Sequence, residues 1–239
     1  MDQRVFKISG IPAVLWGPPC SRVILAVHGS QSSKTDTPIA LLAGIAAEHG
    51  YQVLSFDLPE HGERKSEPTP CTAEPCVRDL RAMMDYAQEK WAHISLFANS
   101  IGAYFCLLAY AKQPLEQAWF LSPVVDMQRL IENMMAAFQV SAERLQREQT
   151  IPTPAGQALS WDYYCYVTAH PVAGWKPQTF LLYGGRDALC EKDTILRFAQ
   201  RFSCALKIIP EAEHYFHTPA QLQAFCSWLK ETMESAPAL

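Results

Sequence analysis

The chain has 239 residues, a net charge of −4 and a composition of 49% hydrophobic and 18% charged residues, which is typical of a soluble globular protein. Lysine and arginine are spread thinly, which argues against nucleic acid or a membrane surface as a partner. Residues 1–12 lack an apolar run of signal-peptide length and no segment approaches a membrane span, so we expect one cytoplasmic domain over residues 1–239. The sequence leaves the oligomeric state open.

Eight cysteines are scattered along the chain without a CxxC pair. A chain of this length needs no disulfide framework, so we interpret the cysteines as reduced and mostly buried. Cys71 and Cys76 lie in the proline-rich stretch SEPTPCTAEPC, where a disulfide between them is the alternative interpretation. No cluster of histidines and cysteines has metal-ligand spacing, and we expect neither a metal nor a cofactor.

Predicted strands and helices alternate along most of the chain. In chain order they are an antiparallel hairpin within 4–15, a strand at 23–27, a helix at 38–49, a strand at 51–56, a loop at 59–75, a helix at 77–91, a strand at 94–98, a helix at 101–112, strands at 118–121 and 179–183, a helix at 192–202, a strand at 205–209 and a helix at 219–231. Short apolar strands that alternate with helices predict an α/β fold, with a mostly parallel central sheet covered by helices on both faces.

The alternation of strands and helices stops between residues 124 and 175. This segment contains a helical half (MQRLIENMMAAF), a charged stretch (AERLQREQ), a predicted turn (IPTPAGQ) and an aromatic half (WDYYCYV), with no strand pattern. A loop of fifty residues without structure is implausible in a compact domain. We therefore predict a small helical insert over one end of the sheet, and we call residues 124–175 the cap insert.

Three polar residues each follow a predicted strand, and they occur in the order Ser100, Asp187 and His214. The carboxyl ends of parallel strands meet at one edge of a sheet, where functional groups gather. A nucleophilic serine needs a base to accept its proton, and the base needs an acid to orient it. The three residues are therefore candidates for a catalytic triad.

The turns around these residues resemble those of the α/β-hydrolase family. The nucleophile elbow of that family, G-x-S-x-G, is matched by ANSIG at 98–102, with alanine in place of the first glycine. Four further turns match it, namely HGS at 28–30, FDLPEHGER at 56–64, YGGRDALCE at 183–191 and EAEHYFHTP at 211–219. The resemblance spans residues 23–229 and implies the α/β-hydrolase fold.

The resemblance also implies acyl transfer. Ser100 would attack a carbonyl carbon, His214 would take its proton, and Asp187 would orient the imidazole. The backbone N–H groups of Ser30 and Ile101 would form the oxyanion hole. We expect a serine hydrolase that cleaves small-molecule carboxylic esters or thioesters. The alternatives are a peptidase or amidase with the same triad, and a non-catalytic protein that binds a ligand in the cleft.

Each member of the predicted triad has a competing interpretation. Without Asp187 and His214, Ser100 would be interpreted as a residue that caps a helix. Asp126 follows a predicted strand and competes with Asp187 as the acid, but Asp187 lies in the matching GGRD loop. His217 competes with His214 as the base, but only His214 is followed directly by two aromatic residues. We therefore favour Asp187 and His214.

The cap insert contains apolar and aromatic side chains that would form the roof of a substrate pocket above Ser100. The candidates are Met134, Phe138, Trp161 and Tyr164. The alternative is that these side chains form only the core of the insert itself.

Overall fold

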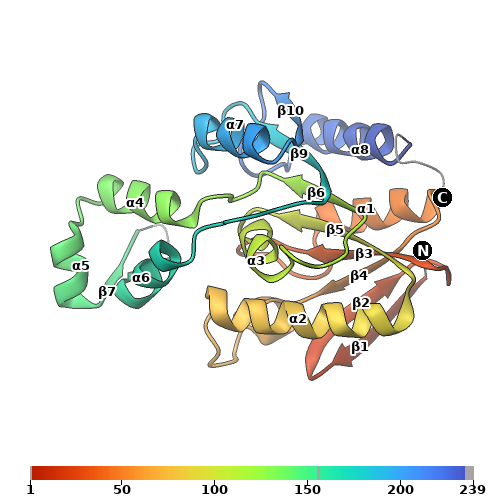
Figure 1. The fold of residues 1–239 in the computed structure, drawn as a ribbon, viewed down its shortest axis with the longest axis horizontal. Coiled ribbons are helices and arrows are strands. Elements are labelled where there is room, and N and C mark those ends of the chain that lie inside the picture. Colours follow the sequence, from red (N-terminus) through yellow and green to blue (C-terminus); the bar gives the residue numbers. More distant parts are fainter. Residues whose placement is uncertain (1, 155–156, 235–239) are drawn as a thin grey trace.

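The computed structural model describes residues 2–154 and 157–234. Its centre is a sheet with the strand order β1-β2-β4-β3-β5-β6-β9-β10 (Figure 1). The strands are β1 (Gln3–Ile8), β2 (Ile11–Trp16), β3 (Arg22–Val27), β4 (Gln52–Phe56), β5 (His93–Asn99), β6 (Gln117–Leu121), β9 (Gln178–Gly184) and β10 (Ala205–Ile209). β2 pairs antiparallel with β1 and β4, and the other neighbours pair in parallel. The predicted mostly parallel sheet is confirmed.

Helices cover both faces of this sheet. α1 (Thr37–Glu48) packs against α8 (Pro219–Glu234) over one apolar cluster. α2 (Ala73–Lys90), α3 (Ile101–Ala109) and α7 (Lys192–Arg201) contribute to the cluster on the other face. Within residues 2–154 and 157–234, no helix combines the length and the apolar character needed to cross a membrane.

The segment between β4 and α2 is more ordered than its sequence indicates. The predicted loop at 59–75 contains the short 3₁₀ helix η1 (Gly62–Arg64), and α2 begins at Ala73 instead of residue 77. Pro75 lies in the first turn of α2. A proline is tolerated there, because the N–H that it lacks would have no acceptor within the helix.

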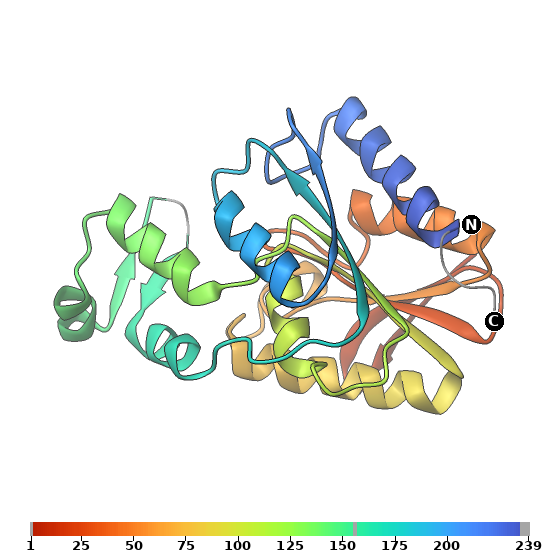
Figure 2. The same ribbon diagram turned by 45° about the horizontal axis from the view of Figure 1, so that its top comes forward.

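The cap insert projects beyond the carboxyl ends of the sheet strands (Figures 1 and 2). It contains α4 (Met127–Ala137), α5 (Ala142–Glu148), β7 (Thr150–Pro152), β8 (Ala158–Ser160) and α6 (Trp161–Ala169). The sequence analysis predicted no strand in this segment. That prediction is wrong, because β7 and β8 form a small antiparallel sheet. Strands of three residues are too short to show an alternating pattern. Part of the predicted turn, residues 155–156, lies outside the described residues.

Candidate active site

Ser100 lies at the sharp turn between β5 and α3. Its backbone has φ +51° and ψ −122°, a conformation that residues other than glycine rarely adopt. The Ser100 N–H donates to the carbonyl oxygen of Leu121, and the Ser100 carbonyl oxygen accepts from the N–H groups of Ala103 and Val124 at 3.0–3.1 Å. The surrounding backbone therefore holds the strained residue in place from both sides.

Small residues allow the loop after β3 to approach this turn closely. A Cβ atom added to Gly102 would overlap the carbonyl oxygen of His28, and one added to Gly29 would lie 3.0 Å from the Cβ atom of Ser100. Ala98, which replaces the first glycine of the elbow pattern, is fully buried. The absence of a side chain at Gly102 therefore permits the close approach of the loop after β3.

Ser100, His214 and Asp187 form a continuous hydrogen-bonded chain. The Ser100 Oγ atom lies 2.8 Å from Nε2 of His214, and Nδ1 of His214 lies 2.7 Å from Oδ2 of Asp187. The Asp187 side chain is fully buried, and its Oδ1 atom accepts from the N–H groups of Leu189 and Cys190 at 2.8 and 2.9 Å. The fixed carboxylate keeps a proton on Nδ1 of His214. Nε2 of His214 is then free to accept the proton of Ser100.

A pair of glycines brings the loop of Asp187 against the loop of His214. A Cβ atom added to Gly184 would overlap the carbonyl oxygen of Glu213, and one added to Gly185 would lie 2.6 Å from that of Pro210. Only residues without a side chain permit this approach. The two glycines of the GGRD sequence are therefore needed for the short distance between Asp187 and His214.

The two competing residues have other partners. Asp126 is exposed, and its Oδ1 atom accepts from the N–H of Arg129 at 3.0 Å, so it caps α4. His217 is also exposed, and its Nδ1 atom contacts the carbonyl oxygen of Tyr215 at 2.8 Å. The carboxylate that contacts His214 is that of Asp187.

The loop that carries Ser30 is supported by a buried histidine. His28 donates from Nδ1 to the carbonyl oxygen of Gly29 at 2.7 Å and accepts at Nε2 from the N–H of Leu58 at 3.0 Å. Burial lowers the pKa of His28 to about 4, although the hydrogen bond to Gly29 acts in the opposite direction. The imidazole is therefore neutral at pH 7. It holds the loop in place by donating one hydrogen bond and accepting another.

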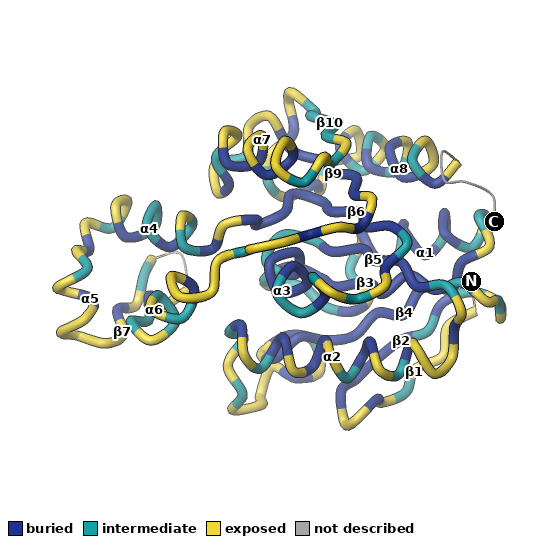
Figure 3. The backbone as a smooth tube through the Cα atoms, in the orientation of Figure 1, coloured by how far each residue is buried: buried dark blue, intermediate teal, exposed yellow. Residues whose placement is uncertain are grey.

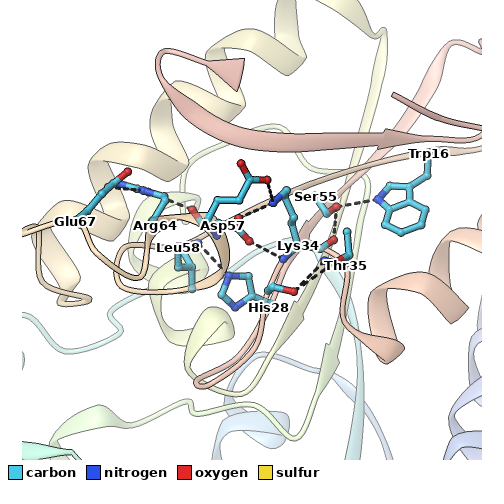
Figure 4. Close-up of polar contacts among 11 residues, drawn as sticks. Trp16, His28, Lys34, Thr35, Ser55, Asp57, Leu58, Arg64 and Glu67 are labelled. Atoms are coloured by element: carbon cyan, nitrogen blue, oxygen red, sulfur yellow. Dashed lines mark hydrogen bonds and ion pairs between the residues drawn. The ribbon is translucent and has the colours of Figure 1, made fainter. Parts of the chain in front are cut away.

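A second buried network lies behind this loop (Figure 4). Asp57 is fully buried and accepts from the backbone N–H of Lys34 at 2.8 Å and from its Nζ atom at 2.6 Å. The N–H of Glu63 also donates to Asp57, and a Cβ atom at Gly62 would overlap the carboxylate. Burial opposes the charge of Lys34, but hydrogen bonds to Asp57 and Glu63 raise its pKa above the ordinary value. Sequence reasoning missed Lys34, because a lysine in a polar loop looks solvent-exposed.

The four predicted pocket residues, Met134, Phe138, Trp161 and Tyr164, are partly buried and pack against the main apolar cluster. The rings of Trp161 and Tyr164 lie 5.9 Å apart, and the Tyr164 hydroxyl donates to Glu132 at 3.3 Å. Both contacts lie within the cap insert. Their contact with a substrate stays a prediction.

A cavity of about 320 Å³ lies between α7 and the segment that follows α6. Its lining includes Tyr104, His170, Arg197 and Phe198. Neither Ser100 nor any of the four predicted pocket residues belongs to its described lining. This cavity is therefore separate from the hydrogen-bonded chain of Ser100.

Asp187 and His214 also belong to a group of side chains with the spacing of metal ligands. Among the described residues, donor atoms of Asp187, Cys190 and His214 lie within 4.8 Å of one another. However, Asp187 and His214 are already joined by a hydrogen bond, and burial raises the pKa of the Cys190 thiol. A thiol must lose its proton to bind a metal. The group is better suited to moving a proton than to holding a metal ion.

Comparisons with known proteins concern the family and the fold of the chain. A family model described as the alpha/beta hydrolase family matches residues 24–227. No curated protein sequence matches the chain. The structure of Est1E from Butyrivibrio proteoclasticus with ferulic acid bound is similar with a TM-score of 0.81, at 18% identity and 98% coverage of both chains. Mouse alpha/beta hydrolase domain-containing protein 10 gives a TM-score of 0.80 at 12% identity, with 99% of this chain and 100% of that chain covered. An esterase from Pyrococcus furiosus, Pf2001, gives 0.72 at 16% identity, with 99% and 91% covered.

Proposed function

Because the chain belongs to the α/β-hydrolase family, we propose that it is a serine hydrolase that cleaves carboxylic esters or thioesters through an acyl-enzyme. The observation that carries this proposal is the hydrogen-bonded chain from Ser100 through His214 to Asp187, with distances of 2.8 and 2.7 Å. These distances lie within the range at which a base can take a proton from a nucleophile.

In the proposed mechanism, His214 accepts the proton of Ser100 as the serine oxygen attacks the carbonyl carbon. The buried Asp187 carboxylate stabilises the imidazolium that forms. The N–H groups of Ile101, at the start of α3, and of Ser30 donate to the oxyanion. His214 then gives this proton to the leaving group. In the second half, His214 takes a proton from a water molecule that attacks the acyl carbon, and it returns this proton to the Ser100 oxygen as the acyl–enzyme bond breaks.

The substrate preference is proposed from the relatives. One similar structure holds ferulic acid, and another is described as an esterase, which supports esters as the substrate class. We propose that the cap insert covers Ser100 within one domain. A hydrogen bond of 3.0 Å from Nε2 of Gln157, on the insert, to Oγ of Ser30 supports this arrangement. A cytoplasmic location and the absence of nucleic-acid and membrane partners remain predictions from the sequence.

The test is the variant Ser100→Ala with a panel of p-nitrophenyl esters, acyl thioesters and aminoacyl amides. The wild-type chain should hydrolyse esters or thioesters faster than amides, and Ser100→Ala should lower kcat by about 10⁶-fold. A fluorophosphonate probe should label the wild-type chain and leave Ser100→Ala unlabelled.

A folded Ser100→Ala protein that retains wild-type turnover would contradict the assignment of the nucleophile. Faster turnover of the amides would identify a peptidase or amidase instead. A wild-type chain that neither reacts with the probe nor turns over any of these substrates would indicate a non-catalytic protein.

A further inference from the structure

Two cysteines outside the triad have their sulfur atoms in contact. Cys71 ends the loop that precedes α2, and Cys76 lies in the first turns of that helix. Their Sγ atoms are 3.7 Å apart. A disulfide bond is about 2.05 Å long, so the two sulfur atoms need to approach by less than about 2 Å. Both cysteines are free thiols in the structure.

The two thiols lie in different environments. Cys71 is partly exposed, whereas the side chain of Cys76 is completely buried among the apolar residues under α2. The backbone N–H of Cys71 donates to Oε2 of Glu60 at 2.7 Å, which holds the loop at the start of the helix. A small oxidant from solvent would therefore reach Cys71 first, and Cys76 would be the second thiol behind it.

Neighbouring groups favour the thiolate of Cys71. The neighbouring side chains of Cys76 and His61 lower the pKa of Cys71, even though burial opposes the shift. For Cys76, burial and the neighbouring Cys71 both raise the pKa. The position of Cys71 just before the N-terminus of α2 favours the thiolate further. Cys71 is thus the nucleophilic thiol and Cys76 the protonated one.

From this geometry we propose that Cys71 and Cys76 are a reversible redox pair, in which Cys71 reacts with a peroxide and Cys76 resolves the product as a disulfide. This modification site does not depend on the proposed hydrolase activity. It also differs from the cysteines at which burial alone raises the pKa, such as Cys106 and Cys204.

The reaction balances with hydrogen peroxide as the oxidant. The Cys71 thiolate attacks one peroxide oxygen, so that an S–O bond forms, the O–O bond breaks and the departing hydroxide takes a proton to become water. The sulfur of Cys76 then attacks that of Cys71, so that an S–S bond forms, the S–O bond breaks and a second water leaves with the proton of Cys76. The two thiols lose two electrons and two protons, and one peroxide is reduced to two waters. A reducing dithiol reverses the change by exchange.

The test uses the full chain, first reduced and desalted and then treated with hydrogen peroxide in small excess. Trypsin cleaves after Lys65 and Arg78, so both cysteines lie in one peptide, residues 66–78. We expect this peptide to become lighter by about 2 Da, without iodoacetamide labelling, and to recover both labels after dithiothreitol. The measurement is mass spectrometry of the labelled digest.

Three variants sharpen the result. In Cys76→Ala, oxidised Cys71 should persist as a sulfenic acid that dimedone captures, because the resolving thiol is absent. In Cys71→Ser, Cys76 should keep its free thiol. The matched control is Cys165→Ser, which removes an exposed thiol on α6 and should leave oxidation of the pair unchanged. In the wild-type chain, Cys71 should react about tenfold faster than Cys165.

Two results would overturn the proposal. The first is a wild-type peptide 66–78 that keeps both free thiols while Cys165 is oxidised. The second is equal reactivity of Cys71 and Cys165 towards peroxide. The wild-type measurement decides the first point without any variant, so a variant that fails to fold does not obscure the outcome.

Discussion

The sheet edge that carries the triad and the cap insert differ in how firmly their side chains are held. At the sheet edge, Asp187 is fully buried and accepts three hydrogen bonds. In the insert, the buried residues of α5 and α6 are Leu145 and Val167, and most of the segment is exposed or half-buried (Figure 3). Reactive groups therefore lie on the rigid part of the molecule, and the part proposed to contact the substrate is the less constrained one.

These two regions share one buried apolar cluster, and polar contacts at the surface also join them. Arg129 of α4 donates from Nε and from a terminal guanidinium nitrogen to the carboxylate of Glu191, which precedes α7. Both side chains are exposed, and pairs of this kind contribute little to stability. The second contact is the hydrogen bond from Gln157 to Ser30. We infer that exposed positions of the insert can change with little effect on the sheet, whereas changes at the sheet edge affect both activity and folding.

After the loss of the nucleophile, the largest expected effect is at the acid. Asp187→Asn should lower kcat by about 10⁴-fold, because an amide in place of the carboxylate leaves His214 in the wrong tautomer. The matched control is Asp126→Asn, which should retain activity and stability because asparagine caps a helix as well as aspartate does. Initial rates on a p-nitrophenyl ester test both variants. A severe loss in Asp126→Asn with a mild one in Asp187→Asn would reverse the assignment.

The next effect concerns the close approach at the elbow. Gly102→Ala should lower the free energy of unfolding by about 3 kcal/mol, because the new methyl group would overlap the His28 carbonyl oxygen. Gly174→Ala is the control, since a Cβ atom there has nothing within 4 Å. Urea unfolding of both variants makes the measurement. Equal stability of the two would show that the loop after β3 moves away easily, and the sheet edge would then not be the rigid region.

A smaller effect is expected on the pH dependence of stability. His28 has a folded-state pKa of about 4, below its ordinary value of 6.5. Between these values the unfolded chain binds more protons than the folded chain, so stability falls as the pH falls. The loss should reach about 2 kcal/mol by pH 5. Urea unfolding at pH 7.5 and pH 5 should show a steeper decline for the wild-type chain than for His28→Gln. The same slope in both would exclude His28 as the cause.

The smallest effect is expected in the cap insert. Phe138→Ala and Trp161→Ala should change the ratio of kcat/KM between short and long acyl chains by several-fold, since one methylene contact in an apolar pocket is worth about 1–3 kcal/mol. The series from C2 to C10 p-nitrophenyl esters tests this. Val5→Ala, on an exposed residue of β1, is the control and should not change the ratio. Uniform changes along the series would mean that the two aromatic side chains only hold the insert together.

The sheet and the proximity of Ser100, His214 and Asp187 could be predicted because both depend on patterns in the sequence. Strands such as β3 are continuous apolar runs, and Ser100, Asp187 and His214 each follow such a run within a few residues. A strand end fixes where the next side chain lies. Chain order left Asp126 and His217 as alternatives, and the resemblance of two turns to the family favoured Asp187 and His214.

Other features could not be predicted, because they depend on contacts between distant segments. The strands β7 and β8 have three residues each and are defined by their pairing. Lys34 is buried because Asp57 and Glu63, from another loop, surround its ammonium group. The proximity of Cys71 and Cys76 depends on where α2 begins, and the sequence pattern placed that start four residues too late.

The backbone of Ser100 has a consequence for selection in the laboratory. Glycine adopts a positive φ without strain, whereas a strained residue of another type destabilises the fold by about 1–3 kcal/mol. A library of this chain screened only for survival of heating would therefore enrich glycine at position 100 and lose the hydroxyl group. Only a screen that also demands turnover would retain the serine. At position 100, heat resistance favours glycine and the proposed activity requires serine.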